Sequence, residues 1–230
     1  MSLSELWSLY GQNYIDALLA TWGMTLESFA IAMVLAVAVT VMRVSPLKPL
    51  RIFGDLYVQV FRNIPGIALL IIVVYALPPL KVVLPYRTCV IVATVFLGSA
   101  FGSENFMSGI NTVGVGQVEA ARSLGMSFSR ILAKIVIPQA LRSSVLPMTN
   151  LFIAVMLTTA LGSQVPLKPQ ELTGVVSYPD LMQNARVLIT NYDALVSVYL
   201  VIAVIYILIN VAINKAAVYV SHKTGATIIR

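Results

Sequence analysis

The sequence predicts an all-α integral membrane protein with about five transmembrane helices. Its 230 residues are 59% hydrophobic and 10% charged, and the mean hydropathy is +0.90. A soluble domain carries about 25% charged residues, so this chain has too few polar side chains to cover a surface in water. The longest stretches without Asp, Glu, Lys or Arg are 28–42, 63–80, 88–103, 143–167 and 194–214.

A helix needs about 20 apolar residues to cross the hydrocarbon core of a bilayer. At that length the spans are predicted at about 20–42, 57–79, 87–107, 143–163 and 194–214. The first begins near Trp22, because this start keeps Glu27 close to the outer interface. Prolines and scattered polar residues predict an external connection at about 164–190. No stretch outside the spans is long enough for a second domain, so we expect a single transmembrane domain over residues 1–230.

The lysines and arginines predict the orientation, because short cytoplasmic loops carry an excess of these residues. With the N-terminus outside, the outer segments hold four of them and the inner segments ten, while Arg62 is set aside as membrane-embedded. The ten are Arg43, Lys48, Arg51, Arg122, Arg130, Lys134, Arg142, Lys215, Lys223 and Arg230. We therefore expect the N-terminus outside and the C-terminus in the cytoplasm. The net charge of +6 follows this topology, and no basic patch with interleaved aromatic residues indicates nucleic acid.

Several classes of chemistry lack the residues that they need. The single cysteine, Cys89, excludes an internal disulfide, and the single histidine leaves no group of residues with metal-ligand spacing. No Gly-Lys dipeptide exists for a phosphate-binding Walker A segment, and neither HExxH nor GxSxG is present. We expect a chain without catalytic residues, metal or cofactor of its own.

The most specific part of the chain is a polar, basic segment at about 112–142, between the third and fourth spans. Glu119, Ala120 and Ala121 lie in a run of good helix formers, which predicts a short helix. Gly125 follows where a left-handed residue would end that helix.

Ser127 can cap a second helix, which is expected to run to Pro138. Two helices joined by a glycine form a compact knob that can sit in a groove on a partner. An ordinary amphipathic loop between two spans is the alternative.

Polar residues inside the spans are the second candidate site, because ionisable groups in lipid are costly and usually face a cavity or another helix. Arg62 lies early on an outward-going span and Glu104 late on an inward-going one, so both lie toward the cytoplasmic half. They form either a structural ion pair or part of a polar path across the membrane. Thr158 and Thr159 either join this path or satisfy backbone carbonyls of their own helix.

Several motifs together resemble one family. The segment 119–138 resembles the EAA loop of bacterial ABC importer permeases, which docks on the ATPase subunit. Residues 61–65 read FRNIP and resemble the F-R-[GN]-[TI]-P segment of polar amino-acid permeases, and residues 138–142, PQALR, resemble that subfamily's continuation. Glu104 resembles the glutamate of its A-E-x-x-R-G-G-I segment. The matches cover about 60–150.

The resemblance implies a subunit of the polar amino-acid importers, which serve glutamate, glutamine, histidine and arginine, in the bacterial plasma (inner) membrane. It implies a second homologous permease subunit, two ATPase subunits that hold ATP and Mg, and an extracytoplasmic substrate-binding protein. By the same resemblance, Glu119, Ala120, Ala121, Gly125 and Ser127 would contact the ATPase. Arg62, Glu104, Thr158 and Thr159 would then line the substrate path.

The chain departs from the family pattern at two charged positions. Met107 stands where the family commonly has an arginine, and residues 157–161 read LTTAL where K-[DN]-T-S-L is common. These changes argue against a cationic substrate and favour a glutamate- or glutamine-like one. They also predict a heterodimer whose other subunit supplies the main ligand contacts.

The small residues Ser99, Gly102 and Ser103 make a close-approach face on the third span, which we expect to face the second permease subunit. The rival interpretation of the whole chain is an autonomous channel or ion-driven secondary transporter. Such proteins often contain inverted repeats, into which five spans cannot divide equally.

Overall fold

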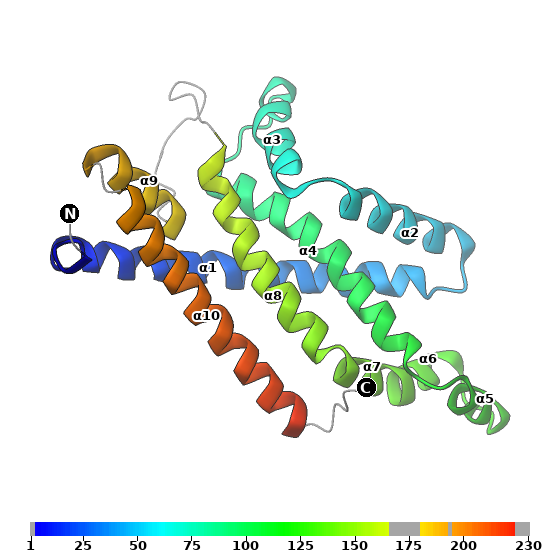
Figure 1. Ribbon diagram of the computed structural model, residues 1–230. Helices are drawn as coiled ribbons and strands as arrows, with labels where there is room; N and C mark the ends of the chain where they lie inside the picture. The colour runs from blue at the N-terminus through cyan, green and yellow to red at the C-terminus, as the bar shows by residue number, and fades with distance from the viewer. Residues whose placement is uncertain (1–2, 166–179, 193–194, 224–230) are drawn as a thin grey trace.

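A computed structural model describes residues 3–165, 180–192 and 195–223, and within these ranges it contains helices and no strand (Figure 1). The α-helices are α1 (Leu3–Arg43), α2 (Lys48–Asn63), α3 (Gly66–Ala76), α4 (Tyr86–Asn111), α5 (Val115–Ser123), α6 (Phe128–Ile131), α7 (Ile137–Ser143), α8 (Val145–Thr159), α9 (Leu181–Tyr192) and α10 (Leu195–Lys223). Two 3-10 helices, η1 (Pro78–Leu80) and η3 (Ala160–Gln164), and a π-helical turn, η2 (Leu132–Val136), lie between them. The predicted all-α class is confirmed.

In the described part of the chain, four helical stretches are long and apolar enough to cross a membrane. They are Tyr10–Arg43, Tyr86–Asn111, Val145–Gln164 and Val196–Lys223. Two further stretches, Lys48–Asn63 and Gly66–Leu80, pass the same test only together and are bent by 99° at the break between them, so the described residues hold four spans, or five if this pair is one span. This count agrees with the prediction of about five spans, and the span expected at 57–79 is broken.

The break has a local cause in Pro65. The proline ring crowds the preceding residue and disfavours its helical conformation. Ile64 is extended, with φ −89° and ψ 125°, so α2 ends at Asn63. Pro65 is then the N-cap of α3, where its missing N–H costs nothing, and its carbonyl accepts the N–H of Leu69 at 3.0 Å.

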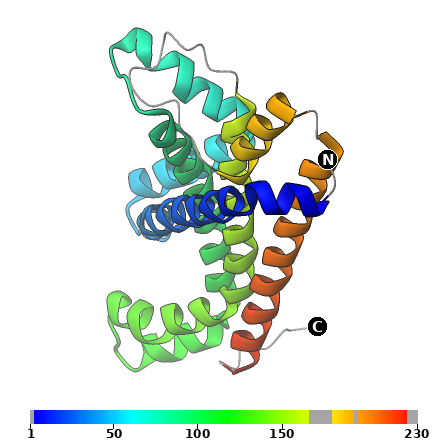
Figure 2. The ribbon, with the colours of Figure 1, turned by 90° about the vertical axis from the view of Figure 1, so that its left-hand side faces the viewer.

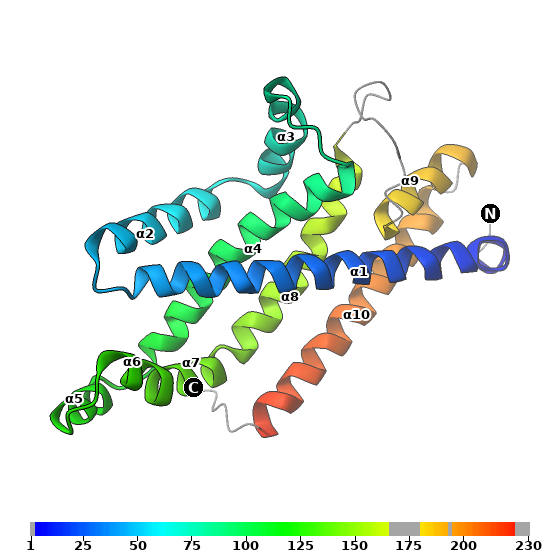
Figure 3. The same ribbon diagram turned by 180° about the vertical axis from the view of Figure 1, so that it is seen from behind.

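Helix α1 is longer than the span expected at 20–42, because it begins at Leu3 and continues for 41 residues. At 1.5 Å per residue this is about 60 Å, roughly twice the thickness of the hydrocarbon core. The polar residues Gln12 and Asp16 lie within this helix. Their side chains are exposed, and Gln12 Nε2 donates to Asp16 Oδ1 at 3.0 Å, so neither side chain competes with the backbone hydrogen bonds of the helix. The helix crosses α4, α8 and α10 obliquely (Figures 1 and 3).

Helix α4 lies at the centre of the fold, between α1 on one side and α8 on the other. A Cβ added to Gly102 would meet the Cβ of Ala36 on α1 at 2.9 Å. Ser99 and Ser103 are fully buried. The expectation that Ser99, Gly102 and Ser103 face a second subunit is therefore wrong. Small residues do allow close approach here, but the helices that approach belong to the same chain.

The predicted external connection at 164–190 is described only in part, because residues 166–179 lie outside the described ranges. Its last part forms α9, which packs against α1 and α10 through a buried cluster that includes Tyr14, Leu181 and Val198. The N–H of Leu181 donates to Thr21 Oγ1 at 3.1 Å. Helices α3 and α9 lie at one end of the molecule, and α5, α6 and α7 lie at the other (Figures 1 and 2).

The C-terminal end of α4 touches α7 at Gly109. A Cβ at this position would lie 2.6 Å from the carbonyl oxygen of Ala140 and closer still to Ser144 Oγ. Ser144 is itself buried, and its hydroxyl donates to the Ala140 carbonyl at 2.7 Å. The obstacle is therefore backbone rather than a flexible side chain, so only glycine fits without a shift.

Replacing Gly109 with alanine should push α4 and α7 apart. Overpacking of this kind costs about 1–3 kcal/mol, so we expect a lower melting temperature of the purified transporter and less assembled protein. Gly23→Ala is the matched control, because nothing lies within 4 Å of a Cβ added at Gly23. Equal melting temperatures for the two variants would contradict this packing.

Candidate coupling segment and membrane-embedded ion network

The segment at 112–142 folds as helix, glycine stop and helix. Helix α5 ends at Ser123, and Gly125 has φ +74°, which a residue with a side chain rarely adopts. The N–H of Gly125 donates to the Arg122 carbonyl at 2.9 Å, and the N–H of Met126 donates to the Ala121 carbonyl at 3.1 Å. These two bonds define a Schellman motif. The predicted left-handed stop at Gly125 is confirmed.

The second helix begins after Ser127, as predicted, but Ser127 does not cap it with its side chain. Its carbonyl instead accepts the N–H groups of Arg130 and Ile131, each at 3.0 Å. The expected end at Pro138 is also wrong, because the chain stays helical to Ser143. The π-turn η2 explains this continuation. The N–H of Ile137 reaches the Leu132 carbonyl, so the widened turn relieves the carbonyl that the proline ring would otherwise meet.

The segment has a small core and a large exposed surface. Ala121 is 3% exposed and packs with Val113, Ile131 and Val136. Glu119, Ala120, Gly125 and Ser127 are exposed. Of the five residues predicted at this site, Ala121 therefore holds the segment together, while the other four lie on its surface.

Three exposed residues that the motif did not single out are apolar. Leu124 is 82% exposed, Val115 70% and Phe128 50%. Arg122 and Arg130 are also exposed. A surface of this composition, apolar with basic groups, is typical of a site that a partner covers.

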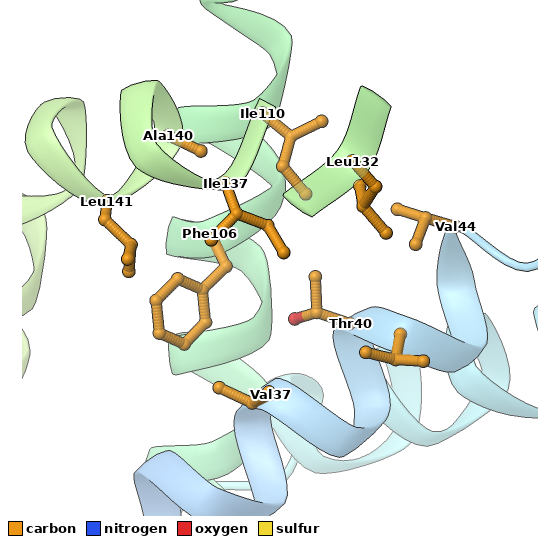
Figure 4. A pocket seen from close by; sticks show the side chains of 10 residues that line it. Val37, Thr40, Val44, Phe106, Ile110, Leu132, Ile137, Ala140 and Leu141 are labelled. Atoms are coloured by element: carbon orange, nitrogen blue, oxygen red, sulfur yellow. The ribbon is translucent and has the colours of Figure 1, made fainter. Parts of the chain in front are cut away.

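An apolar groove lies between the segment at 112–142, here called the candidate coupling segment, and the membrane helices α1 and α4 (Figure 4). It is lined from α1 by Val37, Thr40, Val41 and Val44, from α4 by Phe106 and Ile110, from η2 by Leu132 and from α7 by Ile137, Ala140 and Leu141. The hydroxyl of Thr40 is turned into hydrogen bonds within the fold, to the Ala36 carbonyl at 2.7 Å and to Ser103 Oγ at 3.1 Å. The groove thus presents carbon atoms almost throughout.

Arg62 and Glu104 meet, as one of the two sequence interpretations requires. Arg62 Nη1 lies 3.4 Å from Glu104 Oε2, and both side chains are about 40% exposed. Arg62 also lies over the ring of Phe101, 5.4 Å from its centroid, in a cation–π contact. The two residues therefore join α2 to α4.

A third helix joins this pair through Arg43, which sequence analysis counted only as a cytoplasmic loop charge. Its Nη1 lies 3.1 Å from Glu104 Oε2 and 3.2 Å from Ser103 Oγ, and its Nε lies 2.9 Å from Asp55 Oδ1. The Arg43 side chain is only 12% exposed, against 45% for Asp55. The two arginines and two carboxylates balance in charge.

Asp55 was also missed, since it falls in a polar stretch before the expected second span. The sequence does contain a feature that could have identified Arg43 and Asp55 as a pair. Arg43 and Asp55 flank the short turn between α1 and α2, at 12 positions' separation, so an antiparallel helix pair brings them together.

The two predicted threonines bond to backbone carbonyls of their own helix, as one of the two sequence interpretations requires. Thr158 Oγ1 donates to the Ala154 carbonyl and Thr159 Oγ1 to the Met156 carbonyl, each at 2.8 Å. Thr158 Cγ2 lies 3.8 Å from the place where a Gly66 Cβ would stand, so this threonine adjoins the break between α2 and α3. The first N–H groups of α3 open at this break, as at the start of any helix.

The comparisons with known proteins agree with this fold. The sequence model of the family described as "Binding-protein-dependent transport system inner membrane component" matches residues 28–225. The chain is 30% identical over 221 residues to the "Probable glutamine ABC transporter permease protein" of Bacillus subtilis (strain 168), covering 96% of this chain and 95% of that protein. It is 35% identical over 173 residues to a glutamate transport system permease protein of Corynebacterium efficiens, covering 70% of this chain and 76% of that protein.

A solved structure shares the fold. The "Crystal structure of an amino acid ABC transporter with histidines" superposes with a TM-score of 0.87 at 24% identity, covering 97% of this chain and 99% of that chain. Fold, coupling segment and family match define a multi-pass membrane component of a transport system. The chain belongs to the family of binding-protein-dependent transport system inner membrane components, and it resides in an inner membrane.

Arg43 should be the residue of the network that tolerates change least. Lysine has one compact ammonium and cannot reproduce the forked contact with Asp55 and Glu104. Arg43→Lys should therefore lower the stability of the purified transporter by about 1–3 kcal/mol, since breaking a buried pair costs about 3–5 kcal/mol and the partners here are partly solvated.

Arg62→Lys is the matched control, because Arg62 is 40% exposed and makes one ion pair in the network. Its effect on thermal unfolding should stay within about 1 kcal/mol. A loss of stability as large as that of Arg43→Lys would show that burial does not distinguish the two arginines.

Proposed function

We propose that this chain is the transmembrane subunit of an ATP-driven importer of polar amino acids, glutamate- or glutamine-like in its substrate. The observation that carries the proposal is the exposed helix–glycine–helix segment at the end of a family-matched membrane fold. The relatives whose names state glutamine and glutamate transport support the substrate class. The chain forms one transmembrane domain that provides half of the translocation path.

In this proposal the chain has no catalytic role, and ATP and Mg²⁺ bind to a separate ATPase subunit. Two ATPase subunits dock in the cytoplasm, and an extracytoplasmic binding protein delivers the substrate. The second permease subunit is a homologue rather than a copy, because Met107 and Thr158 replace the charged groups that the family commonly carries at these positions. An autonomous channel or ion-driven transporter is not favoured, because the family works with a binding protein.

Docking on the ATPase uses the surface formed by Glu119, Ala120, Gly125 and Ser127 with the apolar Leu124. A leucine that is 82% exposed gains about 25 cal/mol for each Å² that a partner covers. The Schellman motif fixes the angle between α5 and the following helix, so the surface has one shape before it binds. Such preorganisation reduces the entropy lost on docking.

The conformation of Gly125 gives a direct test of this coupling. Nothing lies within 4 Å of a Cβ added there, so a side chain meets no steric obstacle and only the left-handed backbone opposes it. Gly125→Val should reduce substrate-stimulated ATPase activity by about tenfold while insertion of the subunit stays normal, because β-branched residues strain this conformation by roughly 1–2 kcal/mol.

Gly125→Asn is the matched variant, since asparagine adopts the left-handed conformation readily. It should retain most of the activity. If valine and asparagine behave alike, the shape of the segment does not control docking.

The substrate path passes the ion network in this proposal. Both arginine contacts of Glu104 use its Oε2, and the side chain is 39% exposed, so it can also meet the ammonium group of an amino acid. An ammonium–carboxylate contact is stronger away from bulk water. Thr158, beside the break at Gly66, lies on the same path.

Glu104→Gln separates a substrate role from a structural one. Arg43 keeps Asp55 and Ser103, so the transporter should still assemble, whereas uptake should fall by about 10- to 100-fold through loss of a charge-assisted contact worth about 1.5–3 kcal/mol. Reconstituted uptake and the yield of assembled complex are measured together. Unchanged uptake in assembled complexes would exclude the substrate role, and loss of assembly would assign Glu104 to the structure alone.

A further inference from the structure

A buried carboxyl lies at the start of α9, far along the chain from the ion network. Asp180 is 1% exposed. Its Oδ1 accepts the N–H of Gln183 at 2.7 Å, as the N-cap of a helix does. Its Oδ2 is buried and has no hydrogen-bond partner among the described residues. An ionised carboxylate here would keep one charged oxygen out of water without compensation, which is a costly arrangement.

The surroundings of Asp180 contain further polar atoms of the same kind. Asp180 precedes Leu181, which packs in the cluster that contains Tyr14 of α1 and Tyr206 of α10. Within the part of the chain that the structure describes, both phenolic oxygens are buried without a hydrogen-bond partner, and so is Nδ2 of Asn184, one turn along α9. Tyr206 lies within electrostatic range of Asp180. Native proteins leave few such atoms unsatisfied, so a group of them calls for an explanation.

No cation in the described part of the chain compensates Asp180. Among the described residues, α9 packs mainly against α1, α10 and η3, and η3 carries no titratable residue. The titratable groups that these elements and α9 bring to the neighbourhood are Tyr10, Tyr14, Asp16, Arg186, Tyr192, Tyr199 and Tyr206. Asp16 is exposed and bonded to Gln12, and of Arg186 and Tyr192 only the backbone is described.

We propose that Asp180 is a proton-binding site, which holds a proton while α9 is docked on α1 and α10 and releases it when α9 leaves them. A proton on Oδ2 turns an acceptor without a donor into a donor. The neutral acid avoids the cost of burying a charge, which the ionised carboxylate would incur at an oxygen to which no described group donates a hydrogen bond.

The direction of the pH effect follows from the two states. Burial raises the pKa of docked Asp180 from 3.8 to about 7, although the N–H groups of Gln183 and Met182 act in the opposite direction. Once α9 leaves the cluster, the carboxyl regains its ordinary pKa. Docking is therefore most favourable below about 3.8, weakens as the pH rises from there to about 7, and does not change further above. The proton concentration around α9 thus sets how firmly this helix is held.

Hydrogen exchange of the α9 backbone amides tests the proposal in the assembled transporter in lipid nanodiscs. Exchange rates of the wild type are divided by those of Asp180→Asn at each pH, so the chemical pH dependence of exchange cancels. Asparagine has the shape of the protonated acid and cannot ionise. The ratio should rise by up to about tenfold per pH unit between about pH 5 and 7 and then level off. A ratio that is constant with pH would overturn the proposal, as would faster exchange in the variant at every pH.

Asp16→Asn is the matched control, because it removes an exposed carboxylate from α1, and its exchange profile should follow the wild type throughout. A second measurement does not depend on any variant assembling. The infrared carbonyl band of a protonated carboxylic acid should be present in the wild type below about pH 7 and disappear above it. Absence of that band at about pH 6 would also overturn the proposal.

Discussion

The guanidinium of Arg43 is the group on which the packing of the membrane core depends. It lies at the end of α1 and binds Asp55 of α2 and Glu104 of α4, so one side chain fixes three helices. With α2 held in this way, the Tyr57 hydroxyl lies 2.6 Å from Ser99 Oγ of α4. The ring of Phe61 stacks on that of Phe96, with 4.8 Å between the ring centroids. A charge of this kind is stable in lipid because two carboxylates and a hydroxyl accept from its Nε and Nη1 groups.

The network and the coupling segment are joined by direct contacts. Thr40 lines one side of the apolar groove and α7 lines the opposite side (Figure 4), and the Thr40 hydroxyl bonds to Ser103. Ser103 in turn accepts from Arg43, which binds Glu104. A movement of α7 toward or away from α1 would therefore alter the neighbours of a residue bonded into the ion network. These contacts connect α7 to the ion network in space. Double-mutant cycles would measure whether the two are also coupled in energy.

Features fixed by local geometry were predictable from the sequence, whereas features fixed by distant partners were not. Gly125 and Pro65 each constrain their own backbone, so a left-handed stop and a weakened helix follow from residue type and spacing. Arg43 looked like a loop charge because its partners come from two other helices. Ser99, Gly102 and Ser103 were correctly identified as a close-approach face, but a single sequence does not state which chain approaches. The π-turn before Pro138 was not predicted, because a proline more often marks the end of a helix than a widened turn within one.

The length of α1 has a consequence for the order in which the protein is made. Its C-terminal half meets α2 and α4, which follow soon after it in the chain. Its N-terminal half meets Leu181, Ala185, Val198 and Ile202, which are synthesised much later. Tyr14 and Ala17 therefore leave the ribosome long before their native neighbours and lack them until α9 and the first part of α10 have emerged. Closure of this contact joins segments that are far apart in the sequence, so a chain truncated before α10 retains a partly folded core and an α1 without its late-synthesised neighbours.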